Sequence, residues 1–112
     1  DISHEELDTI IDILIETPLD GIEAVSGSTD MLTDQKGAIC GAALTERAIE
    51  MVQYIAERSG HNYPIIGSGG MMTPSDIRRM MDAGASLVAL SSGLRENGLN
   101  LLKQAAKEID AK

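Results

Sequence analysis

The sequence predicts an α/β fold of parallel strands alternating with helices, and three features of the chain support this prediction. Helix-like and strand-like segments alternate along all 112 residues. Residues 65–66 and 87–90, in two of the strand-like segments, are apolar without alternation, as is typical of parallel strands covered on both faces. Each strand-like segment ends in glycines and small hydroxyl residues. We expect about three strands and four helices in right-handed βαβ units, forming one domain over residues 1–112.

The first predicted element is an amphipathic helix. Ser3 and Glu6 have the spacing of a capping box. The apolar residues that follow recur at helical intervals: Leu7, Ile10, Ile11, Leu14 and Ile15. Residues 20–25 form a short strand that leads into the small, polar run 26–30. A long loop follows, to about Ala43.

A second helix is predicted from Thr45 to Gly60, because a glycine suits the left-handed position after a helix. The strand 64–66 follows and runs into the glycine-rich segment 67–70. Thr73 then supplies an N-cap, and the next residue is a proline, which is favoured at the first helical position. A third helix therefore begins here.

The third helix ends at Gly84, and the third strand spans residues 85–90. The segment 91–93 is predicted to be a turn, and a last helix covers roughly residues 99–109. Helices on one face of three strands leave the other face and the strand edges open. The sheet must therefore pair with strands of another chain or segment, or be covered by helices on both faces.

Composition and charge exclude several classes of function. The chain has 9 basic and 18 acidic residues and a net charge of −9, which repels nucleic acids and anionic membranes. Its apolar runs are far shorter than the roughly 20 residues that span a bilayer. Cys40 is the only cysteine, so no intramolecular disulfide can form, and we expect a cytoplasmic protein.

Glycines and serines at the three strand ends predict an anion site. The carboxyl ends of parallel strands lie at one edge of a sheet, where ligands bind. Glycines let backbone N–H groups approach an anion, and serine hydroxyls add donors. The helix that begins at Thr73 is expected to direct its positive end to the same place. Together these features predict a cradle for a phosphate-bearing small molecule.

Other candidate residues favour structural roles. His4 and His61 are expected to be exposed, and they are too isolated to suggest a metal site. Cys40 has no histidine near it in sequence, so a buried or inert thiol is the favoured interpretation, with a nucleophile as the alternative. The six methionines are expected to fill gaps in the core and at its rim.

Three segments in the second half of the chain form a recognisable pattern: Pro64-Ile65-Ile66-Gly67-Ser68-Gly69-Gly70, Asp82-Ala83-Gly84-Ala85-Ser86-Leu87-Val88 and Ser91-Ser92-Gly93. Together they resemble the C-terminal part of dihydroorotate dehydrogenase. Residues 37–45 are similar to that family's Gly-Gly-Leu-Ser-Gly-x-Pro-Leu loop, and residues 20–28 are similar to its sixth strand and Asn-Thr-Thr turn. The resemblance runs in order over essentially the whole chain.

The resemblance implies the last three strands of a (β/α)₈ TIM barrel, completed by oligomerisation or by a missing N-terminal part. It also implies an oxidoreductase that uses FMN to convert dihydroorotate to orotate in pyrimidine biosynthesis. The family's catalytic base and flavin-contacting lysine lie upstream of the matched segment, so this chain carries no catalytic residue. It would carry the FMN-phosphate site, and the residues implied for that site are Gly41, Gly69, Gly70, Ser91 and Ser92.

The chain departs from the family pattern mainly at the strand ends. Ser26 and Gly27 replace the last two residues of Thr-Asn-Thr, which contact the pyrimidine in the family, so substrate recognition is altered. Ala38 and Cys40 replace a glycine and the serine of the family's loop. The scaffold segment 83–88 keeps the family pattern. This distribution indicates a site that has drifted, been retuned or been deliberately altered on a retained scaffold.

Two alternative functions remain open from the sequence. The chain could be a non-catalytic partial barrel that acts as a binding or assembly module, with two copies covering each other's open sheets. It could also be part of another barrel enzyme with a phosphate-bearing ligand, whose other half lies on a separate chain. A homo-oligomer is expected in the first case, and a bound phosphate in the second.

Overall fold

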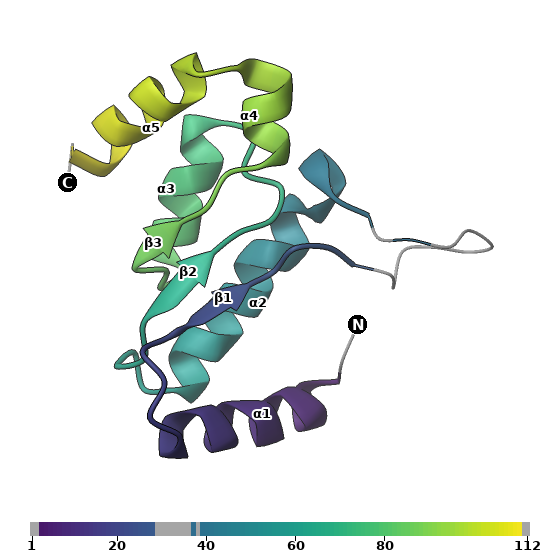
Figure 1. Cartoon of the computed structure of the whole chain (residues 1–112), viewed down its shortest axis with the longest axis vertical. Coiled ribbons are helices and arrows are strands. Elements are labelled where there is room, and N and C mark those ends of the chain that lie inside the picture. Colours follow the sequence, from purple (N-terminus) through teal and green to yellow (C-terminus); the bar gives the residue numbers. More distant parts are fainter. Residues whose placement is uncertain (1–2, 29–36, 38, 111–112) are drawn as a thin grey trace.

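The computed structural model describes residues 3–28, 37 and 39–110. The elements follow in the order α1 (His4–Glu16), β1 (Ile22–Ala24), the 3₁₀ helix η1 (Gly41–Leu44), α2 (Thr45–Arg58), β2 (Ile65–Gly67), α3 (Pro74–Asp82), β3 (Leu87–Val88), α4 (Ser92–Asn97) and α5 (Asn100–Asp110). Figure 1 shows α1 and α5 at opposite ends of the molecule, with the sheet between them. The predicted alternation of strands and helices is confirmed.

The three strands form one parallel sheet in the order β1-β2-β3. Side chains alternate between its faces with the period of two that strands impose. Gly67 lies on the covered face, where a Cβ atom on it would stand 2.5 Å from Met80 Cγ of α3. The helix α2 packs on β1 and β2 and lies behind them in Figure 1. Helices therefore cover one face of the sheet.

The opposite face of the sheet is open. Glu23, Ile66 and Leu87 stand side by side on it, because Glu23 is in register with Ile66 and Ile66 with Leu87. All three are exposed, and the two apolar side chains are 37% and 63% accessible. The expectation that both faces of these strands are covered is therefore not met within the described residues.

The predicted helix signals act as expected. The Ser3 hydroxyl accepts a hydrogen bond from the Glu6 N–H at 3.1 Å, and the Glu6 carboxylate accepts one from the Ser3 N–H at 2.8 Å. These bonds from Ser3 lower the pKa of Glu6. After α2, Gly60 adopts the left-handed conformation with φ of +70°. Capping and left-handed glycines are local effects, so the sequence could predict both.

The number of helices differs from the prediction, because residues 92–97 form the short helix α4 where only a turn was expected. Tertiary contact explains the difference. Gly93 is buried, and a Cβ atom on it would overlap the carbonyl oxygen of Met71. The Asn97 amide also donates to the Met72 carbonyl at 3.0 Å. Contacts with the segment after β2 thus hold this turn of helix, and propensity alone does not indicate them.

None of the helices within the described ranges combines the length and the apolar character that crossing a membrane requires.

A buried hydrogen bond joins α2 to the segment after β2. The Thr45 hydroxyl donates to the Gly70 carbonyl oxygen at 2.5 Å. Replacing Thr45 with Val removes this bond while keeping a β-branched side chain. We therefore expect the free energy of unfolding to fall by about 1–3 kcal/mol. Urea denaturation followed by circular dichroism would measure the change.

The matched control for this substitution is Thr9→Val. Thr9 is exposed, and its hydroxyl donates to the Glu5 carbonyl within α1 at 3.2 Å. We expect this control to change stability by no more than about 0.5 kcal/mol. Equal losses in the two variants would show that the Thr45 bond does not hold these segments together.

Candidate functional site

The ends of the three strands border one cavity of about 370 Å³, called here the strand-end cavity. It lies where ligands bind in parallel α/β folds, beyond the carboxyl ends of the strands. Its lining residues are Glu23, Ser26, Cys40, Ser68, Gly69, Gly70, Met71, Ala89, Leu90, Ser91, Ser92 and Arg95. The parallel sheet therefore brings together segments that lie up to about 70 residues apart in the sequence.

Most of the residues predicted for the site line this cavity. Five of the seven do so: Ser26, Gly69, Gly70, Ser91 and Ser92. Gly41 lies just behind the wall, since a Cβ atom on it would stand 4.0 Å from Ser92 Cβ. Gly27 is half-buried and is not among the lining residues. The predicted convergence of the three strand ends thus agrees with the structure.

Close approach of the backbones forms the wall between β1 and β2. The Ser68 N–H donates to the Ala24 carbonyl at 2.7 Å, and the Val25 N–H donates to the Ser68 carbonyl at 2.9 Å. Gly69 has φ of +103°, and a Cβ atom on it would overlap the Val25 carbonyl oxygen. A side chain is therefore excluded at Gly69, and the backbone itself faces the cavity.

The start of α3 was expected to contribute to the cavity, but it does not. The Asp76 carboxylate accepts hydrogen bonds from the N–H groups of Met72 and Thr73, at 3.2 and 3.0 Å. The Thr73 hydroxyl accepts one from the Asp76 N–H at 3.1 Å. A carboxylate of the protein thus satisfies the N–H groups that were expected to face an anion. Neither Thr73 nor Asp76 lines the cavity.

Cys40 was predicted to have a buried or inert thiol, and the buried alternative is wrong, because the residue is exposed and lines the cavity. The backbones of Ser28 and Ile39 form an isolated antiparallel bridge with hydrogen bonds of 3.1 and 2.8 Å. This bridge brings the next residue, Cys40, to the cavity. Residues 29–36, in the predicted long loop, and Ala38, in the segment compared with the family motif, lie outside the described residues.

Two charged side chains at the cavity were missed from the sequence, Glu23 on β1 and Arg95 on α4. Arg95 follows a segment that was predicted to be a turn, so no helical face was assigned to it. Glu23 lay inside a predicted strand without a partner to mark it. Only the register and the position of α4 place both at one cavity, next to the serines.

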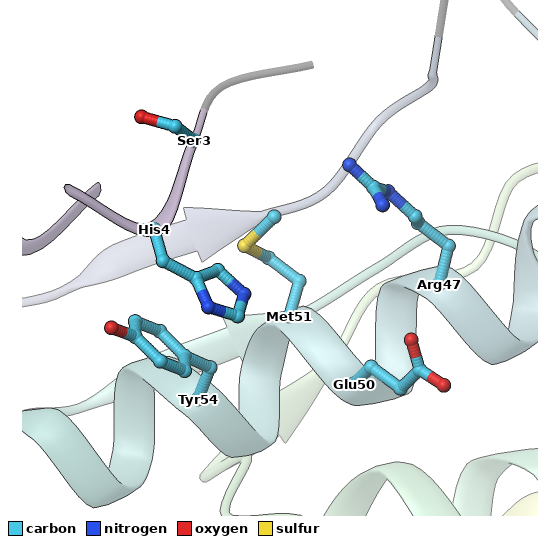
Figure 2. A pocket seen from close by; sticks show the side chains of 6 residues that line it. All are labelled: Ser3, His4, Arg47, Glu50, Met51 and Tyr54. Atoms are coloured by element: carbon cyan, nitrogen blue, oxygen red, sulfur yellow. The ribbon is translucent and has the colours of Figure 1, made fainter. Parts of the chain in front are cut away.

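A second cavity, of about 520 Å³, lies between α1 and α2 and is lined by Ser3, His4, Arg47, Glu50, Met51 and Tyr54. Figure 2 shows the His4 and Tyr54 rings facing each other, and their centroids are 4.1 Å apart. The Tyr54 hydroxyl donates to Asp8 at 2.6 Å, which raises the pKa of Tyr54. These contacts join two helices, so we assign this cavity a structural role despite its larger volume.

No metal-binding cluster of three His, Cys, Asp or Glu residues occurs within the described part of the chain.

Comparison with known proteins identifies a family. The model of the dihydroorotate dehydrogenase family matches residues 1–112. The chain is 34% identical over 115 residues to dihydroorotate dehydrogenase (quinone) of Christiangramia forsetii, covering 97% of this chain and 34% of that protein. It is 32% identical over 114 residues to the enzyme of the same name from Dichelobacter nodosus, covering 96% of this chain and 34% of that protein. The chain thus spans about a third of the length of these relatives.

Solved structures agree on the fold. A ligand-free dihydroorotate dehydrogenase from Eimeria tenella superposes with a TM-score of 0.86 at 24% identity, covering 97% of this chain and 32% of that one. The same enzyme in complex with ferulenol gives a TM-score of 0.88 at 24% identity, with 97% and 31% covered. At this identity the likeness concerns the fold alone. The chain therefore matches part of a barrel, with an open sheet.

Gly93 is expected to control the position of α4 against the strand-end cavity. In Gly93→Ala the added methyl group would overlap the Met71 carbonyl, so α4 must shift. We expect a loss of about 1–3 kcal/mol in unfolding free energy. Urea denaturation would measure it, with Glu96→Ala on the exposed side of the same helix as control. The control is expected to stay within about 0.5 kcal/mol, and an equally mild Gly93→Ala would contradict the packing argument.

Proposed function

The chain belongs to the dihydroorotate dehydrogenase family, and from this we propose that it forms the part of such an enzyme that holds the phosphate of FMN. The strand-end cavity is the observation that carries the proposal. Five residues predicted for the cofactor or the substrate line it together. Its volume lies within the roughly 300–1,000 Å³ that is usual for small-molecule sites.

The groups in the cavity suit a phosphate ester. Ser91 and Ser92 offer hydroxyl donors at the end of β3. The backbone at Gly69 and Gly70 approaches the cavity without intervening Cβ atoms. Arg95 adds a cation that suits phosphate oxygens. A phosphate therefore finds neutral and cationic donors at the β2 and β3 ends of the cavity.

In this proposal the chain binds and orients the cofactor, and bound FMN supplies the redox chemistry that oxidises dihydroorotate to orotate in pyrimidine biosynthesis. Ser26 lines the cavity from β1, on the side proposed to meet the pyrimidine, whereas Gly27 stands outside the lining. The catalytic base and the flavin-contacting lysine are assigned to the part of the barrel upstream of the matched segment. We therefore propose that the 112-residue chain alone does not oxidise dihydroorotate. A cytoplasmic location remains a prediction.

A second candidate function, a non-catalytic assembly module, is favoured by the open sheet face. Ile66 and Leu87 are exposed there beside each other, and burying such side chains is favourable. A second copy of the chain could cover this face and form a homo-oligomer. The other alternative, a barrel enzyme of a different family, is set aside because the family model matches the whole chain.

FMN titration tests the cofactor proposal. We expect saturable quenching of flavin fluorescence by the purified chain, with inorganic phosphate as a competitor. Ser92→Leu should weaken binding about tenfold or more, because it removes a hydroxyl and fills part of the cavity. Ser75→Leu is the matched control, since Ser75 is near the start of α3 and does not line the cavity. Absence of binding by the unmodified chain, or equal weakening in both variants, would contradict the proposal.

Light scattering tests the assembly module. If a second copy covers the open face, the unmodified chain should have at least twice the monomer mass, and Leu87→Arg should return it to a monomer. Lys103→Arg on the exposed surface of α5 serves as control and should leave the mass unchanged. A folded monomer at all concentrations would argue against this function.

A further inference from the structure

We propose that Arg95 is the residue that makes the strand-end cavity select a phosphorylated ligand over its uncharged counterpart, a step that rests on the proposed FMN function. The selection concerns the terminal phosphate. FMN and riboflavin share the ring system and ribityl chain, and only FMN carries the phosphate. Arg95 would bind this group, so it would raise affinity for FMN and leave riboflavin unaffected.

The position of Arg95 follows from α4. The Arg95 N–H donates to the Ser91 carbonyl at 3.1 Å, so Arg95 lies one helical turn after Ser91. Residues three and four apart share a helix face, and Ser91, Ser92 and Arg95 all line the same cavity. Arg95, which is exposed, and the two serines therefore border the cavity from one side.

Arg95 also differs from the other arginines in its partners. Arg58 pairs with Asp8 and Asp12 at 3.5 and 3.2 Å, and Arg79 pairs with Glu46 at 2.6 Å. Arg78 lies 4.0 Å from Glu108. Within the described part of the chain, the guanidinium of Arg95 has no ion pair and no hydrogen bond. It therefore remains available for an anionic ligand.

Two contacts hold the helix that carries this guanidinium. Gly93 packs against the backbone of Met71, and the Asn97 amide donates to the Met72 carbonyl at 3.0 Å. Both contacts join α4 to the segment that follows β2. Because Gly69 and Gly70 belong to the same segment, the backbone from which the Arg95 side chain extends is held beside the glycines of the cavity.

Charge at the cavity sets the orientation of the ligand. Glu23 lines it from β1 and Arg95 from beyond β3, and these strands are the two edges of the sheet. In a chain of net charge −9, Arg95 is the only cation among the described lining residues. A phosphate is attracted to the Arg95 side and repelled from the Glu23 side. The uncharged part of the ligand therefore points toward β1.

Paired titrations with FMN and riboflavin test the inference. For Arg95→Gln we expect FMN affinity to fall about tenfold and riboflavin affinity to stay within about twofold, since only a charge-assisted bond is lost. Arg95→Lys should keep part of the preference for FMN, because it keeps the charge but loses the planar fork. Raising salt from about 0.05 to about 0.5 M should weaken FMN binding to the unmodified chain more than to Arg95→Gln.

Lys103→Gln is the matched control, because it removes the same charge from an exposed position on α5 that does not line the cavity. It should leave both affinities unchanged. Unchanged FMN affinity in Arg95→Gln, or an equal loss for FMN and riboflavin, would overturn the role of Arg95 while leaving the cofactor proposal in place. Absence of FMN binding by the unmodified chain would instead overturn both proposals.

Discussion

At the end of β2, the backbone approaches three other segments so closely that added side chains would overlap it. Gly69 lies against the Val25 carbonyl after β1, and Gly70 lies against Thr45 at the start of α2. The backbone of Met71 packs against Gly93 of α4. Three consecutive residues thus contact three separate segments, each at a distance that a side chain would prevent. The strand-end cavity exists because these segments meet here.

The two faces of the sheet differ in what covers them. The covered face packs small and apolar residues against helices, and Ile65 and Met80 are fully buried there. The open face presents Glu23, Ile66 and Leu87. In the full-length relatives the rest of the protein is about twice as long as this chain, which suits a barrel whose remaining strands lie beside this sheet. The open face is thus consistent with part of a barrel.

The wall of the cavity could be predicted from the sequence, but its charged residues could not. Gly70 and Ser91 could be predicted because turns after parallel strands share one edge of the sheet. Arg95 could not, because its helix forms through contacts of Gly93 and Asn97 with a distant segment. At the start of α3 the prediction of an anion site was wrong, because the Asp76 carboxylate already accepts hydrogen bonds from the N–H groups of Met72 and Thr73.

The order of helices and strands, the caps, the family resemblance and the small residues at the strand ends could be predicted from the sequence. These properties depend on neighbours a few residues apart or on short motifs. The exposure of Cys40 at the cavity, the absence of Thr73 from its lining, and the position of Glu23 and Arg95 at the same space followed from the three-dimensional arrangement. Strand register and helix packing bring these residues together, and their separation in sequence carries no signal of their contact.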